Sequence, residues 1–256
     1  MTVAALRMVE REARVYRRTW RGSAISGLIE PVFFLAAMGL GLGGLVRSGA
    51  GSVEGVDYID FLAPGLLAAS LMQTAIGEST WPVLAAIKWA KTYDAILATP
   101  IRVVDLLVGR IAWIAIRLGL SALAFFLVAI PFGVWHSPLA VLVVPVAMLT
   151  GLAFAIPVHG YAATIEQDSG FVLLYRLGII PLFLFSGTFF PISQLPGGLQ
   201  AVAKVTPLWH GVALCRDLAL GRAEWAPSLL HLGYVLLVIA VTFAYALRAF
   251  TRRLTR

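Results

Sequence analysis

The sequence lacks the charge and the cysteines that are common in soluble and secreted domains. Only 13% of its 256 residues are charged, against about 25% in a soluble domain. Cys215 is the only cysteine, so the chain cannot form an internal disulfide. With 60% hydrophobic residues and a mean hydropathy of +0.88, the chain has more apolar surface than one soluble core can bury. The composition therefore predicts a membrane protein.

Motifs for common catalytic chemistry are missing as well. The sequence contains no GxxxxGK[ST] loop for the phosphates of ATP, and no HExxH, CxxC or GxSxG motif. Its four histidines, His136, His159, His210 and His231, do not have the spacing of metal ligands. We therefore expect no catalytic site, no metal site and no cofactor in this chain.

Six apolar segments are long enough to cross a bilayer, which takes about 20 helical residues per crossing. The second is the weakest, because Pro64, Gln73 and Gly77 interrupt it. The predicted spans are residues 25–46, 59–76, 106–130, 139–162, 171–190 and 228–250. We predict an all-α polytopic membrane protein with a single transmembrane domain. Its parts are an interfacial helix (1–22), a six-span bundle (23–250) and a tail (251–256).

Residues 5–21 show the periodicity of an amphipathic helix before the first span. Leu6, Val9, Ala13, Tyr16 and Trp20 recur at steps of three and four, and arginines recur on another face. This pattern is typical of a helix that lies along a membrane surface. A solvated helix packed on a partner domain is the alternative.

The basic residues are distributed unevenly over the six-span topology. Thirteen lysines and arginines lie on the side of the termini and four on the opposite side, leaving out three within or near spans. Because basic residues gather on the cytoplasmic side, we predict that both termini are cytoplasmic. The same distribution accounts for the net charge of +7 without nucleic acid as a partner.

Residues 88–110 predict a short helix between the second and third spans. The segment from Tyr93 to Ala98 suits a helix, and Thr99 and Pro100 end it, because proline disfavours helical geometry at the preceding residue. We expect Tyr93, Ile96 and Leu97 to form an exposed apolar patch of the kind that contacts a partner. A plain connector is the alternative.

Residues 185–221 interrupt the apolar pattern after the fifth span with prolines and glycines. Irregular backbone cannot face lipid, yet residues 199–204 and 209–220 are too apolar for a solvated loop. Two short re-entrant helices at the outer rim satisfy both conditions. Pro191 would help to end the fifth span, Pro196 and Gly197 would turn the chain, and Pro207 would start the second short helix.

Four stretches of the chain resemble one known family. They are EPVFFLAAMGLGLGG (30–44), DFLAPGLLAAS (60–70), KTYDAILATPIRVVDLLVGR (91–110) and FPISQLPGGLQAVAKVTPLWHGVALCRDLALG (190–221). Together they resemble the membrane subunit of ATP-binding-cassette exporters of the second type. The similarity is greatest to permeases of nodulation-type lipo-oligosaccharide exporters and to daunorubicin-resistance permeases.

The resemblance implies an ABC permease of a bacterial inner membrane. A separate nucleotide-binding subunit, which binds ATP and Mg, would dock on the loop between spans two and three. Two permeases would pair, as a homodimer or with a related partner, and move a lipid-linked glycan, a lipo-oligosaccharide or another amphipathic molecule outward. A multidrug efflux permease of the same family is the alternative. The expected coupling residues are Lys91, Thr92, Tyr93, Asp94, Leu97, Thr99 and Pro100.

The stretch after the fifth span would form the outer gate of such an exporter. The expected gate residues are Phe189, Phe190, Pro191, Pro196, Gly197, Pro207 and Trp209. Two charges within predicted spans are candidates for substrate contact, because charges inside a membrane are costly. Arg176 could meet an anionic head group or pair with Glu166 or Asp168, and Glu30 could instead be a structural partner of an arginine.

Two other function classes remain on the sequence alone. An ATP-independent secondary transporter would need polar groups near the middle of the bilayer, which are sparse here, and repeated spans, which are not evident. A membrane enzyme acting on lipid-linked sugars would need a catalytic cluster that the sequence does not offer.

Overall fold

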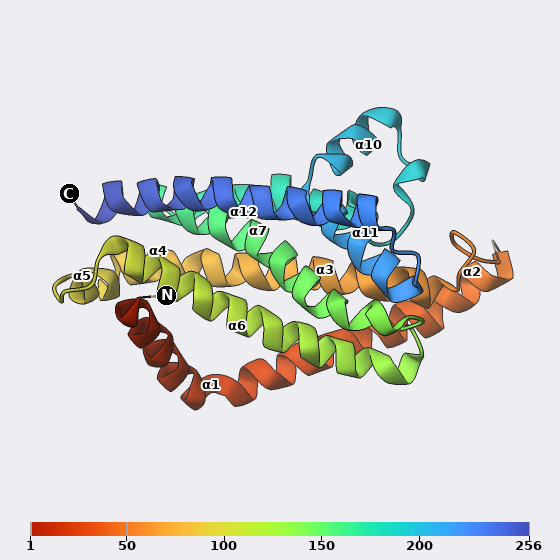
Figure 1. Cartoon of the computed structure of the whole chain (residues 1–256), viewed down its shortest axis with the longest axis horizontal. Helices are drawn as coiled ribbons and strands as arrows, with labels where there is room; N and C mark the ends of the chain where they lie inside the picture. The colour runs from red at the N-terminus through yellow and green to blue at the C-terminus, as the bar shows by residue number, and fades with distance from the viewer. Residues whose placement is uncertain (1, 50, 256) are drawn as a thin grey trace.

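The computed structural model describes residues 2–49 and 51–255, and their side chains except those of residues 19, 21, 23–31, 39, 40, 42 and 45–47. This part of the chain is almost entirely helical, and its only strand-like pairing is an isolated bridge between Val53 and Val56. Most helices run along one long axis, and both termini lie at the same end of it (Figure 1). We call this the terminal end and the opposite one the distal end. The all-α prediction is confirmed.

Four helical segments are long and apolar enough to cross a membrane, and they correspond to predicted spans two, three, four and six. They are Tyr58–Lys88, Val103–Phe132, Pro138–Thr164 and Trp225–Leu254. Their main helices are α3 (Tyr58–Ser79) with α4 (Trp81–Lys88), α6 (Val103–Ala129), α7 (Val143–Thr164) and α12 (Trp225–Leu254). These four segments are consistent with the predicted multi-pass membrane protein.

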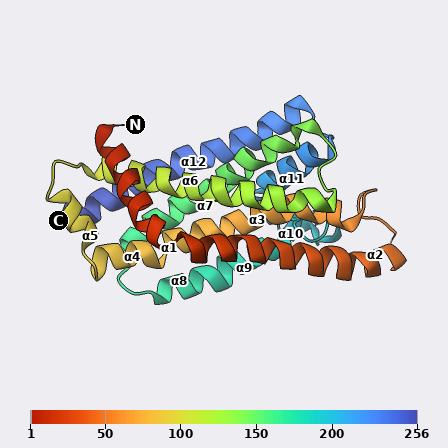
Figure 2. The same ribbon diagram turned by 90° about the horizontal axis from the view of Figure 1, so that it is seen from below.

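The surface helix and the first predicted span form one continuous helical run. α1 (Val3–Leu35) passes through a π-helical segment, η1 (Ala36–Leu42), into α2 (Gly43–Gly49). The run bends instead of breaking, so that its first part lies across the long axis of the molecule and the rest along it (Figures 1 and 2). The C-terminal helix α12 likewise extends through most of the predicted tail, to Leu254.

The fifth predicted span is the shortest and ends earlier than the sequence indicates. It consists of α8 (Ser169–Leu174), the π-helical η4 (Tyr175–Ile179) and α9 (Ile180–Phe185). Its predicted end at Phe190 is wrong by five residues. Residues 186–190 form a turn instead, because contacts from other helices satisfy its polar groups, as described below.

The second span, which looks weakest by sequence, is the most enclosed of the four. In its most apolar window 72% of residues are buried, against 17% for α12. α3 packs against α7, α6 and α11, and α7 in turn packs against α12. Pro64 is tolerated in α3 because it is buried among protein neighbours, whereas Gln73 and Gly77 lie on the exposed side of the helix.

The predicted short helices are present. They are α5 (Thr92–Leu97), α10 (Gly197–Lys204) and α11 (Pro207–Leu220). Thr206 caps α11 by accepting a hydrogen bond from the Trp209 backbone N–H, with Pro207 in the first turn. α10 projects from the distal end in Figure 1, but α11 is not on the rim, since it packs against α3, α7 and α12.

We expect Gly211→Ala to destabilise the bundle by about 1–3 kcal/mol, because an added methyl group overpacks a tight contact. A Cβ at Gly211 would lie 2.2 Å from Oγ1 of Thr150, on the facing surface of α7. Gly233→Ala is the control, since a Cβ on this α12 residue meets nothing within 4 Å. Thermal unfolding in detergent measures both. Equal midpoints for the two variants would contradict the close approach of α11 and α7.

Candidate functional site

The short helix α5 lies at the terminal end, between α4 and α6 (Figure 1). Lys91 precedes it with a φ of 46°, in the left-handed region that non-glycine residues rarely adopt. The chain therefore turns sharply at Lys91 before α5 begins. At its end, Oγ1 of Thr99 donates to the Ile96 carbonyl at 2.6 Å. Four of the predicted coupling residues, Lys91, Asp94, Thr99 and Pro100, are exposed.

The predicted exposed apolar patch on α5 is not formed as expected. Tyr93 is only 2% exposed and belongs to a hydrophobic cluster that includes Phe250. Ile96 and Leu97 are half-buried against the same cluster. The Tyr93 ring lies 6.0 Å from that of Phe250 on α12, and Phe250 stacks on His159 of α7 at 5.6 Å. Burial raises the pKa of the Tyr93 hydroxyl. Tyr93 thus connects α5 to the bundle and is not available for direct contact with a partner.

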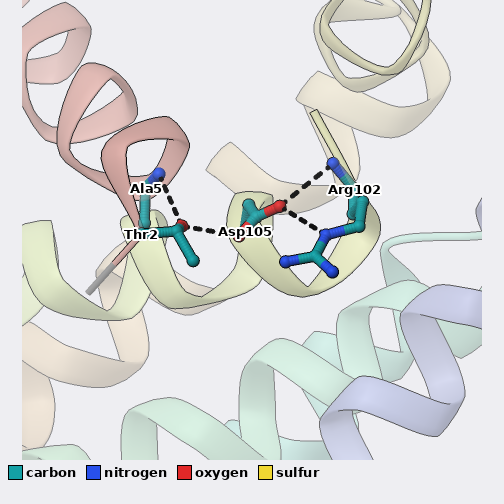
Figure 3. A network of polar contacts seen from close by, with 4 residues as sticks. All are labelled: Thr2, Ala5, Arg102 and Asp105. Carbon is teal, nitrogen blue, oxygen red and sulfur yellow. Dashed lines mark hydrogen bonds and ion pairs between the residues drawn. The ribbon is translucent and has the colours of Figure 1, made fainter. Parts of the chain in front are cut away.

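The N-terminus of α1 is joined to the start of α6, directly after the α5 loop (Figure 3). Oγ1 of Thr2 accepts from the Ala5 backbone N–H at 3.2 Å and donates to Oδ1 of Asp105 at 2.6 Å. The other carboxylate oxygen of Asp105 accepts from Nε of Arg102 at 3.0 Å and from its backbone N–H at 3.3 Å. One carboxylate therefore binds the first turn of α1 to the first turn of α6.

Below this contact, α1 and α6 approach closely enough to exclude any side chain at Gly109. A Cβ there would lie 2.5 Å from Cβ of Met8 and 3.0 Å from the Ala5 carbonyl oxygen. Further along, Tyr16 meets Trp113 edge to face at 5.6 Å. We call this contact between residues 2–16 and 105–117 the α1–α6 seam.

The two arginines that the sequence places within the third span have carboxylate partners along this seam. Nη1 of Arg110, which is 8% exposed, lies 2.9 Å from Oε2 of Glu12 on α1. Arg117 pairs with Glu78 of α3 and lies over the Tyr16 ring at 5.0 Å. The guanidinium of Arg110 also lies within electrostatic reach of the Tyr93 hydroxyl, which forms no hydrogen bond with the described residues. Charges from α1, α3 and α6 are thus neutralised in pairs near α5.

An apolar cavity of about 620 Å³ lies towards the distal end. Side chains of α1, η1, α3 and α9 line it, together with the loop before α3 and the chain that follows α9. Phe34, Phe183 and Phe189 stand close together there, with ring centroids 6.0 and 5.1 Å from that of Phe189. The lining residues are Phe34, Met38, Val53, Tyr58, Phe183, Leu184, Phe189, Phe190, Pro191 and Gln194.

Arg216 of α11 holds the turn that closes this cavity, a role that the sequence interpretation missed. Its Nη2 donates to the Gly187 carbonyl at 2.8 Å and its Nε to the Phe61 carbonyl of α3 at 3.1 Å. Its guanidinium also lies 3.7 Å above the Phe61 ring. In the six-span topology predicted from the sequence, Arg216 is one of the four basic residues on the side opposite the termini. An arginine within the apolar run GVALCRDLAL was the signal that it needs internal partners.

The turn 186–190 satisfies its remaining polar groups locally. The buried hydroxyls of Ser186 and Thr188 lie 3.1 Å apart, and Gly187 adopts a φ of +83°. The hydroxyl of Tyr58 donates to the Phe189 carbonyl at 3.2 Å. These contacts explain why the helix of the fifth span ends at Phe185.

The predicted gate residues fall into two groups. Phe189, Phe190 and Pro191 line the cavity, whereas the other four are not among the residues described as lining it. Trp209 packs instead against two histidines, with centroid distances of 4.9 Å to His210 and 5.2 Å to His231. Nδ1 of His210 lies 2.8 Å from Nδ1 of His231. No cluster of three or more metal-ligating side chains occurs in the described part of the chain.

The two candidate charges for substrate contact have different outcomes. The side chain of Glu30 lies outside the described residues. Arg176, in η4, is exposed and has no ion pair with any described side chain. Glu166, one of the two carboxylates that the sequence offered as a partner for Arg176, pairs with Arg253 of α12 instead.

Comparison with known proteins finds similarity over almost the whole chain. The family model for the ABC-2 type transporter matches residues 4–220. Nodulation protein J of Rhizobium leguminosarum bv. viciae is 33% identical over 249 residues, which cover 94% of each chain. Nodulation protein J of Rhizobium meliloti (strain 1021) is 33% identical over 93% of this chain and 89% of that one. Inner membrane transport permease YadH of Escherichia coli (strain K12) is 25% identical, over 91% and 88%.

We expect Gly109→Ala to detach the first part of α1 from α6. The overpacking costs about 1–3 kcal/mol, and each 1.4 kcal/mol makes an open form about tenfold more populated. Trypsin should therefore cleave the arginine-rich segment 7–21 about fivefold faster or more. Gly119→Ala on the same helix is the control, since its Cβ would meet only Sδ of Met148 at 3.5 Å. Equal cleavage rates in the two variants would refute the tight seam.

We expect Arg216→Met to destabilise the protein by about 1–3 kcal/mol, because the Gly187 carbonyl loses its donor in a buried turn. Arg222→Met is the matched control, since Arg222 is exposed and makes one 3.3 Å contact to the Glu54 carbonyl. It should change stability by less than about 0.5 kcal/mol. Thermal unfolding in detergent compares them, and an unchanged midpoint for Arg216→Met would show that this residue does not hold the turn.

Proposed function

The chain belongs to the ABC-2 type transporter family, and we propose that it is the membrane subunit of an ATP-driven exporter for an amphipathic molecule. It is a transport permease and not an enzyme, as in its relatives. The observation that carries the proposal is the match of residues 4–220, which includes α5, most of the α1–α6 seam and every residue that lines the distal cavity.

ATP hydrolysis is assigned to a separate subunit. Permeases of this family normally work with an ATP-binding subunit, and this sequence has no phosphate-binding loop of its own. We propose that the subunit, with its ATP and Mg, docks on the exposed side of α5, where Lys91, Asp94, Thr99 and Pro100 lie. Thr92, Tyr93 and Leu97 would then act from the inner side of α5, by transmitting its movement to the bundle.

The contacts of Tyr93 support such a transmission. Its ring packs on Phe250 of α12, and it interacts with Arg110, which is paired with Glu12 of α1. A displacement of α5 therefore pushes on α12 and on the α1–α6 seam together. We propose that this movement opens and closes the distal end, with Phe189, Phe190 and Pro191 as part of the gate.

A second permease copy, or a related permease, is proposed as partner because of the exposed face of α8, η4 and α9. Leu173, Leu177 and Ile180 there are 59%, 73% and 51% exposed, which suits lipid, but Arg176 between them does not. A charge that faces lipid is costly. A paired subunit, or a polar path between two subunits, would relieve this cost and bring Arg176 near an anionic head group.

The distal cavity supports a substrate with an apolar part. Its volume lies in the range of small-ligand pockets, roughly 300–1,000 Å³, and its lining is almost entirely aromatic and aliphatic. We propose a lipid-linked glycan or lipo-oligosaccharide whose lipid part enters this cavity. The aromatic lining would equally suit an apolar drug, which keeps a multidrug efflux permease as the second candidate.

The full topology is proposed with both termini in the cytoplasm of a bacterium and the bundle in its inner membrane. It consists of the four spanning segments, the α1–α2 run as first span and α8–α9 as fifth. The terminal end is then the ATPase side and the distal end the outer side. The excess of basic residues at the terminal end supports this orientation.

We expect charge reversal on α5, Lys91→Glu with Asp94→Lys, to reduce copurification of the ATP-binding subunit at least tenfold. The double variant keeps the net charge but inverts the local pattern that a docked partner would meet. Pull-down of the tagged permease from its host membrane, with immunoblotting or mass spectrometry of the ATPase, measures this.

The matched control is Lys204→Glu with Glu224→Lys, two exposed residues at the distal end. It should leave copurification unchanged. Both variants must retain the wild-type thermal midpoint, which excludes misfolding as the cause. If no ATPase copurifies with the wild-type permease, or if transport proceeds without ATP, the exporter proposal fails in favour of an ATP-independent transporter.

A further inference from the structure

A second cavity, of about 430 Å³, lies at the terminal end between the last turns of α7 and α12. Three arginines, all from α12, line this cavity, and the proposed export function does not use them. The lining residues are Ala163, Thr164, Tyr245, Arg248, Ala249, Arg252 and Arg253. We propose that this cavity binds the phosphate head group of an anionic phospholipid.

The charges of the cavity favour an anion. Arg248 and Arg252 are exposed and have no ion pair with any described side chain. Arg253 is paired with Glu166, whose Oε2 accepts from Nη2 at 3.1 Å. This hydrogen bond lowers the pKa of Glu166, so the carboxylate is ionised at neutral pH and remains committed to Arg253. Two guanidinium groups are thus left, and guanidinium binds phosphate oxygens in a bidentate manner.

The surface that leads to the cavity fits an acyl chain. Leu237, Val241 and Tyr245 are 61%, 61% and 43% exposed, and they continue into Arg248 and Arg252 at steps of four, four, three and four. These steps keep all five residues on one face of α12. At a rise of about 1.5 Å per residue, the 11 steps from Leu237 to Arg248 span about 17 Å, close to half of a hydrocarbon core of about 30 Å.

An anionic phospholipid satisfies both parts of this surface. Its phosphate meets Arg248 and Arg252, and its chains lie against the apolar stripe towards the distal end. A free phosphate ester would use only the arginines, and an acidic surface of a partner protein would leave the stripe unused. The leaflet is the cytoplasmic one under the orientation proposed above, but the binding itself does not depend on export activity.

The test is lipid titration of the purified full-length permease by native mass spectrometry, without an ATPase. Phosphatidylglycerol and phosphatidylcholine with the same acyl chains are compared. We expect wild type to bind phosphatidylglycerol at least tenfold more tightly, and Arg248→Gln with Arg252→Gln to lose this preference. Arg7→Gln with Arg18→Gln, two exposed arginines of α1 that line no described cavity, should retain it.

Glu166→Gln gives a change in the opposite direction, because it frees Arg253 for the phosphate. We expect this variant to bind phosphatidylglycerol several-fold more tightly. Glycerol 3-phosphate should not displace the lipid at equal concentration, since it lacks the chains.

Three results would overturn the proposal, provided that thermal unfolding shows the variants to be folded. The first is an equal loss of preference in the two double-arginine variants, which would indicate general attraction to basic residues. The second is displacement by glycerol 3-phosphate. The third is an unchanged preference for phosphatidylglycerol in Arg248→Gln with Arg252→Gln; reduced ATPase copurification in the same variant would then assign the surface to the partner subunit.

Discussion

A charge or peptide group inside this apolar bundle is costly unless it finds a partner within the protein, because lipid offers none. The α1–α6 seam is the clearest result of this constraint. Arg110 is nearly fully buried in the third span, and the carboxylate closest to it is Glu12, almost a hundred residues away in the chain. The N-terminal part of α1 therefore completes the bundle and is not an appendage to it. Because Asp105 joins the same helix to the residue after the α5 loop, the position of α5 is defined by contacts from both sides.

The same constraint shapes the distal end, with backbone carbonyls in place of carboxylates. Arg216 donates to Gly187 and Phe61 and lies over an aromatic face, so its charge is balanced by dipoles from two other elements. The turn that it holds presents Phe189 and Phe190 to the cavity. A loop without these contacts would expose unpaired amides in an apolar region, and the cavity would lose one of its walls.

Local patterns predicted the features that depend on neighbours in sequence. Hydropathy located spans two, three, four and six, and proline positions located α5, α10 and α11 to within a few residues. The missed features depend on contacts between distant segments. Tyr93 turns inward because Phe250 and Arg110 meet it there, and the fifth span ends at Phe185 because Arg216, about thirty residues later, binds the next turn. No periodicity within residues 88–110 or 171–190 contains that information. For the same reason Phe189, Phe190 and Pro191 line the cavity, whereas Trp209, about twenty residues later, packs on the histidine pair of α11 and α12.

Two helices reach from the α5 region to the distal cavity, and their surroundings differ. In α3, Glu78 lies towards the α5 region and Tyr58 lines the distal cavity. This helix is enclosed by α6, α7 and α11, so it can move only with them. In α1, Glu12 lies towards the α5 region, and Phe34 lines the distal cavity together with Met38 of the following η1. Its described contacts are concentrated on α6, and its continuation is a π-helical segment, a rare geometry that is frequent at functional sites. A force applied at α5 would act through Arg110 on Glu12 of α1, whose described contacts are mainly with α6. We therefore expect α1, and not α3, to carry movement from the proposed docking surface to the cavity wall.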